Sequence, residues 1–101
     1  MIVFLGTELK LNINIQPIDG LTMDDYNFEV EAFVYERKSV RLDKQNCVKV
    51  DSNNYIARID TNVIGTGDVT CRVTADIPDA DFHDGLRKEV VAIDTGVRIV
   101  R

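Results

Sequence analysis

The sequence predicts an all-β fold, a two-layer antiparallel β-sandwich of about seven strands. Apolar and polar residues alternate in about seven short segments separated by polar turns, and this period of two is typical of strands with one buried face. No segment keeps the 3.6-residue apolar period of a helix over three turns. Val, Ile and Thr outnumber Ala and Leu, which also favours strands. The 101 residues have room for one domain.

The N-terminal half is expected to supply the first strands. Residues 1–7 form an apolar arm or an edge strand, and residues 8–101 form the sandwich domain. Apolar residues alternate with Lys, Asn and Gln from Leu9 to Ile15, and Pro17 then ends the strand. The segment Tyr26–Arg37 alternates in the same way and is predicted as the next strand.

The middle of the chain alternates over shorter lengths. Val40–Leu42 and Val48–Val50 indicate one or two short strands, and Asp51–Asn54 is the strongest turn signal in the chain. Tyr55–Asp60 is predicted as a strand. Thr61–Thr66 then crosses over, with a single helical turn as one reading of its centre.

The C-terminal hairpin, Gly67–Val100, has the cleanest alternation. Its first strand places Val69, Cys71, Val73, Ala75 and Ile77 on one face, and its second places Val91, Ile93, Val97 and Ile99 on one face. The resulting sandwich is immunoglobulin-like in architecture only, because Trp is absent and Cys47 and Cys71 are too close in sequence for the usual inter-sheet bridge. A small barrel is the alternative.

The charge and the termini of the sequence limit the function classes. The net charge of −5 and the pI of about 4.7 argue against nucleic acid or an anionic membrane as partner. The N-terminus lacks the basic residues and the length of a signal peptide, so the protein is expected to be made in a cytoplasm and not secreted. Both cysteines are then expected to be reduced, with a cross-sheet disulfide as the alternative.

One loop gathers residues that suit a cation. Asp79, Asp81 and Asp84 offer hard oxygen donors for Ca²⁺, but the spacing does not fit the EF-hand pattern and flanking helices are not expected. The alternative is a solvated hairpin loop whose carboxylates accept hydrogen bonds from nearby backbone N–H groups. His83 has no Ser or Cys nucleophile nearby in sequence and no second His. The sequence therefore predicts no catalytic, cofactor or resident metal site, and this loop is kept as a cation candidate only.

Two features indicate contacts with other proteins. Ile2, Val3, Phe4 and Leu5 are consecutive apolar residues, so a half-buried strand would expose one of their faces. We expect this stretch to lie on a neighbouring subunit and not in the chain's own core; an edge strand packed at home is the alternative. The aromatic pair Phe33 and Tyr35 falls on the outward parity of its strand and is the second candidate contact, with burial within the chain's own sandwich as the alternative.

The second half of the chain resembles a domain of tailed-phage virion proteins. The matching runs are Ile59-Asp60-Thr61, Gly65-Thr66-Gly67-Asp68-Val69, Val73-Thr74-Ala75-Asp76-Ile77-Pro78-Asp79, Asp84-Gly85-Leu86-Arg87-Lys88-Glu89 and Val97-Arg98-Ile99. They are similar to the immunoglobulin-like sandwich at the start of baseplate upper proteins and to small head auxiliary proteins that decorate capsids.

This resemblance implies a structural role without catalysis. The expected function is a capsid decoration or head auxiliary subunit, located in the virion and bound to the major capsid protein or to baseplate and tail proteins; further copies of the chain itself are another expected partner. Baseplate adaptors usually continue into a stalk, whereas this sequence ends at Arg101, which favours the decoration subunit. The alternatives are a baseplate or tail adaptor, a host immunity or inhibitor domain, and a carbohydrate- or cell-surface-binding module that uses Tyr26, Tyr35 and Tyr55 in place of the usual Trp.

Overall fold

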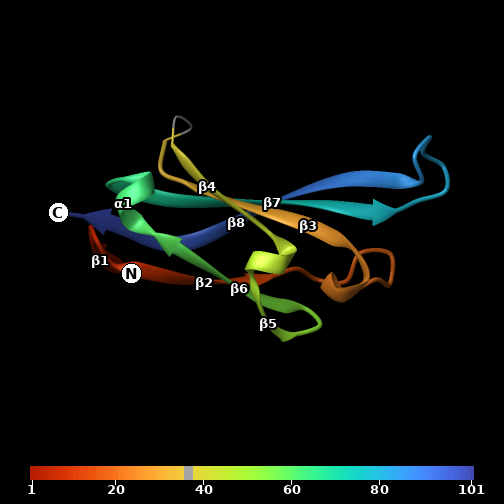
Figure 1. Cartoon of the computed structure of the whole chain (residues 1–101), viewed down its shortest axis with the longest axis horizontal. Coiled ribbons are helices and arrows are strands. Elements are labelled where there is room, and N and C mark those ends of the chain that lie inside the picture. The colour runs from red at the N-terminus through yellow and green to blue at the C-terminus, as the bar shows by residue number, and fades with distance from the viewer. Residues whose placement is uncertain (36–37) are drawn as a thin grey trace.

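The computed structural model describes residues 1–35 and 38–101, and this part of the chain forms eight strands in two sheets (Figure 1). The strands are β1 (Ile2–Phe4), β2 (Glu8–Asn14), β3 (Asn27–Phe33), β4 (Ser39–Asp43), β5 (Val48–Asp51), β6 (Asn54–Asp60), β7 (Gly67–Pro78) and β8 (Leu86–Val100). The predicted all-β, two-layer sandwich is confirmed, with eight strands where about seven were expected. The last two residues of the predicted strand Tyr26–Arg37 lie outside the described residues.

The larger sheet has the strand order β1-β8-β7-β3-β4, and the smaller sheet has the order β2-β6-β5. Neighbouring strands are antiparallel except β1 and β8, which are parallel, with Ile2 opposite Arg98. The prediction of a purely antiparallel sandwich is therefore wrong at this pair. The reason is the link after β1, where Gly6 at a φ of 100° lets the chain cross to the smaller sheet and form no hairpin.

One hydrophobic core lies between the two sheets, and it consists of the inward-facing side chains of the long strands. Burial alternates residue by residue along β2, where Leu9, Leu11 and Ile13 are buried and their neighbours are exposed. The same alternation runs through β3, β6 and β7. The core faces predicted for Phe28–Ala32 and for Val69–Ile77 are confirmed, because inward residues of both segments join one buried cluster.

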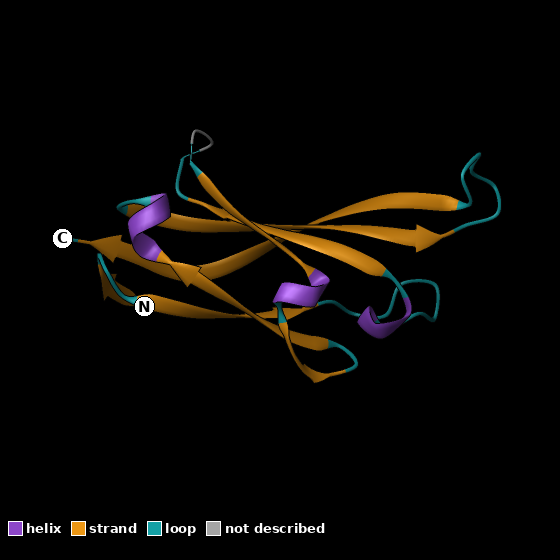
Figure 2. Cartoon of the chain, in the orientation of Figure 1, coloured by secondary structure: helices purple, strands orange, loops and turns teal. Residues whose placement is uncertain are grey.

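Three short helices connect the strands (Figure 2). They are η1 (Met23–Asp25), η2 (Lys44–Asn46) and α1 (Thr61–Ile64). The helical turn predicted in the crossover is confirmed as α1, where the Asp60 carboxylate accepts a hydrogen bond of 2.9 Å from the backbone N–H of Asn62. In the described part of the chain, no helix has the length and apolar character needed to cross a membrane.

Thr61, at the start of α1, joins the two sheets at one end of the molecule. Its side chain is fully buried, its hydroxyl donates to the carbonyl of Thr7 at 2.8 Å, and it accepts from the N–H of Gly6 at 2.8 Å. These two hydrogen bonds, one donated and one accepted, offset the free-energy cost of removing the buried hydroxyl from water. Thr61 therefore stabilises the link that places β1 in one sheet and β2 in the other.

The hairpin of β7 and β8 is the longest element of the fold. Figure 1 shows its tip, residues 79–85, lying beyond the smaller sheet along the long axis of the molecule, which measures 48 Å. The pairing is regular from Pro78–Leu86 to Thr70–Asp94 and then shifts at a bulge. There the Thr95 hydroxyl donates to the carbonyl of Val69 at 2.7 Å, which holds the bulged part of β8 on its neighbour.

Candidate interaction surfaces

The N-terminal stretch is part of the chain's own sandwich. Val3 and Leu5 are half-buried and contact the core, and the N–H of Leu5 donates to the carbonyl of Val100 at 2.7 Å. The prediction that the whole stretch Ile2–Leu5 lies outside this core is therefore wrong, because pairing with β8 turns alternate side chains inward. The other two side chains, Ile2 and Phe4, face solvent and are each 67% exposed.

Phe33 does not form an exposed aromatic pair with Tyr35. Phe33 is only 8% exposed because the Arg72 guanidinium lies over its ring, 4.7 Å from the ring centroid. Glu31 holds Arg72 in place through a hydrogen bond of 2.7 Å, and its second oxygen accepts from Arg41 at 2.9 Å. The prediction that Phe33 is an exposed contact residue is therefore wrong. Tyr35 remains a candidate, with 71% of its surface exposed.

The fold brings Tyr35 and the N-terminal stretch to the same end of the molecule. Leu5 and Tyr35 line one open groove together with Ile64 of α1. Lys38, Asn62 and Thr66 add polar groups to this groove. Two of the predicted contact segments, which are far apart in sequence, therefore form one surface that we call the end groove.

Two carboxylates of the hairpin loop, those of Asp79 and Asp84, are bound to groups of the chain itself. Asp79 accepts from Arg87 at 2.6 Å and from the N–H of Asp81 at 3.0 Å, and Asp84 accepts from the N–H of Leu86 at 3.0 Å. In the described residues, no three carboxylate, His or Cys side chains are grouped in a way that suits a metal ion. The backbone N–H of Asp81 and the Arg87 guanidinium hold the pKa of Asp79 below its usual range.

Arg87 forms a cluster that the sequence patterns did not reveal. Its guanidinium bonds to Asp79, to Asp19 at 2.5 Å and to Glu89 at 3.0 Å, and hydrogen bonds to these carboxylates raise its pKa. Asp19 lies in the loop after β2, so this cluster ties the base of the projecting hairpin to the other sheet. The sequence contains one indication of this cluster. Arg87 lies on the same inward face of β8 as the apolar residues Val91 and Ile93, and a charged residue on that face needs partners.

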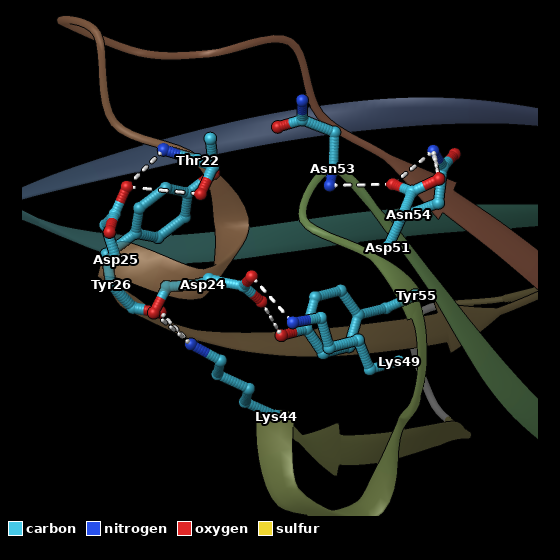
Figure 3. A network of polar contacts seen from close by, with 10 residues as sticks. All are labelled: Thr22, Asp24, Asp25, Tyr26, Lys44, Lys49, Asp51, Asn53, Asn54 and Tyr55. Atoms are coloured by element: carbon cyan, nitrogen blue, oxygen red, sulfur yellow. Dashed lines mark hydrogen bonds and ion pairs between the residues drawn. The ribbon is translucent and has the colours of Figure 1, made fainter.

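A second polar network closes the sandwich near η1 (Figure 3). The Asp24 carboxylate accepts from Lys49 at 2.8 Å and from the Tyr55 hydroxyl at 2.6 Å, and these bonds lower its pKa. Burial and the bond to Asp24 raise the pKa of Tyr55 to about 12, so it stays a hydrogen-bond donor at neutral pH. Lys44 donates to the carbonyls of Asp24 and Tyr26. The network joins η1, η2, β5 and β6, and we expect it to stabilise this part of the fold.

The cysteines, the single histidine and two of the three tyrosines do not form a reactive or binding site in the described residues. Cys47 and Cys71 are free and buried, and burial raises the pKa of Cys71 to about 11. His83 is exposed in the hairpin loop. Tyr26 and Tyr55 are only 4% and 5% exposed. The idea that three tyrosines form a sugar-binding platform is therefore wrong, since Tyr35 alone of the three reaches solvent.

Comparisons with known proteins found no matching family, no similar curated protein and no similar solved structure.

Proposed function

We propose that this chain is a non-enzymatic structural subunit of a tailed-phage virion, most specifically a capsid decoration or head auxiliary protein that binds the capsid lattice. The observation that carries the proposal is the outward face of β1. Ile2 and Phe4 are each 67% exposed on the edge strand of the larger sheet. Apolar side chains on an edge strand favour a contact in which another protein covers them.

The end groove supports the same proposal. The exposed Tyr35 and half-buried Leu5 give it apolar surface next to that edge strand, and Lys38 provides a charged rim. Aromatic anchors with a polar rim are typical of protein–protein contacts. The resemblance of the second half of the chain to head auxiliary and baseplate proteins gives the partner class: other virion proteins.

The proposal is tested by co-sedimentation of the chain with heads and, separately, with tails purified from a phage that encodes it. Saturable binding to heads is expected. Ile2→Ser and Phe4→Ser should each weaken this binding at least several-fold, while Val50→Ser, which alters an exposed apolar residue of the smaller sheet, should leave it unchanged. Binding to tails alone would indicate a baseplate or tail adaptor. Binding to neither, together with binding to a glycan panel, would overturn the virion proposal.

A further inference from the structure

β8 has a long open edge. It is paired with β7 along one side, but on its other side β1 covers only Arg98–Val100. The carbonyl of Gly96 accepts a hydrogen bond of 2.7 Å from the N-terminal ammonium of Met1, so in the described part of the chain this side of β8 is open from Leu86 to Thr95. The backbone N–H and C=O groups along an open edge are available for pairing with another strand.

The side chains of this open edge are apolar at its centre. Val90, Val91, Ala92 and Ile93 are consecutive, and Val90 is 62% exposed. Charged residues often protect such edges from pairing. Here Arg87 and Glu89 are already bonded to each other, and Arg87 also to Asp79 and Asp19, so their charges are compensated within the chain.

We propose that β8 pairs antiparallel with β8 of a second copy of this chain, around a twofold axis at Val91. Each Lys88 then lies directly opposite Asp94 of the other copy, and each Val90 lies opposite Ala92. All four residues are on the outward face of β8, so directly opposed residues in this register share a face. Among the described residues neither Lys88 nor Asp94 forms an ion pair within its own chain.

Neighbouring registers lack this complementarity. A twofold axis at Val90 places Lys88 opposite Ala92 and leaves both charges unpaired. An axis at Glu89 places two glutamates opposite each other, and an axis at Ala92 places Asp94 opposite Val90. Like charges directly opposite each other destabilise a strand pair, and unpaired charges give it no support.

The length of the open edge of β8 also favours a twofold axis at Val91. In the register centred on Val91, Arg87 near the start of β8 lies opposite Thr95, the last residue before the Gly96 carbonyl that the Met1 ammonium occupies. Each copy therefore fills the open edge of the other, and the two larger sheets become one continuous sheet. The surface used is separate from the outward face of β1, so this inference holds whether or not the chain binds a virion.

The test is sedimentation equilibrium of the full chain over a range of concentrations. A reversible dimer is expected. Lys88→Asp and Asp94→Lys each place like charges opposite each other twice, so each should raise the dimer dissociation constant by about tenfold or more. The double variant, Lys88→Asp with Asp94→Lys, restores opposite charges and should return the dissociation constant toward the wild-type value. Arg58→Asp makes the same charge change as Lys88→Asp, but on the exposed side of β6, and should have little effect on the dimer dissociation constant.

A cross-linking experiment tests the register directly and does not rely on the charged variants. Val90→Cys and Ala92→Cys alter exposed positions, and both native cysteines are buried. After the two variants are mixed and oxidised, the mixed disulfide dimer should dominate, because directly opposed Cβ atoms lie about 4.5–5.5 Å apart and diagonal ones farther. A monomer at all concentrations, a dimer indifferent to the single charge reversals, or equal yields of mixed and same-variant disulfides would each overturn the proposal.

Discussion

Substitutions at Val73 measure how much the central strand β7 contributes to stability. Val73 is completely buried between Val30 on β3 and Val91 on β8. Val73→Ala removes two methyl groups and leaves a cavity, which is expected to cost about 2–3 kcal/mol, at about 0.8 kcal/mol per buried carbon plus a cavity contribution. For a domain of this size, that cost lowers the Tm by roughly 10–20 °C.

Val73→Asp is expected to prevent folding at neutral pH. An unpaired carboxylate in this core costs several kcal/mol, a large part of a total stability of about 5–15 kcal/mol. Thermal melts followed by far-ultraviolet circular dichroism measure both variants. Thr74→Asn is the matched control, because the next side chain along β7 faces outward between Glu29 and Val90 and should keep its Tm within a few degrees. A folded Val73→Asp variant that melts with this control would refute the assigned core face.

Three further predictions concern the edge strand, the hairpin loop and the arginine cluster. Deletion of Met1–Leu5 is expected to lower the Tm in a thermal melt, because Val3 and Leu5 contact the core; an unchanged Tm would count against the observed pairing. Addition of millimolar Ca²⁺ is expected to leave the Tm unchanged, and the opposite result would be a rise of several degrees that Asp81→Ala abolishes. Arg87→Ala is expected to lower the Tm at neutral pH. Because the pKa of Asp79 is lowered in the folded state, its contribution is present above the unfolded pKa of about 4 and is lost as the pH falls through the folded pKa. The Tm difference between wild type and Arg87→Ala should therefore shrink as the pH falls below about 4, and a Tm difference that grows over this range would contradict the reasoning.

The alternation of the sequence was sufficient to predict the strands and their buried faces. In β2, β3 and β7 every residue predicted to face inward is buried, because burial of one face of a strand selects apolar residues at every second position. The crossover helix α1 was also predictable, since Asp60 precedes it as a cap and Gly65 follows it with a φ of 83°.

Pairing between strands and contacts between distant side chains could not be predicted in this way. Alternation defines the two faces of a strand but not its neighbours, so the parallel pairing of β1 with β8 was missed. The alternation places Phe33 on the correct face, but Arg72, which covers its ring, lies on the neighbouring strand β7. The Arg87 cluster unites residues from the loop after β2, the hairpin loop and β8, and becomes visible only in three dimensions.

The pairing of β1 with β8 also has a consequence for the order of folding. Ile2 and Arg98 are joined across nearly the whole chain, so their contact requires the closure of a very long loop, whereas the β7–β8 hairpin closes locally. We therefore expect β1, the strand that completes the larger sheet, to dock after the β7–β8 hairpin has formed. If β1 docks late, substitutions that weaken the packing of Val3 and Leu5 are expected to speed unfolding and to leave the rate of folding nearly unchanged.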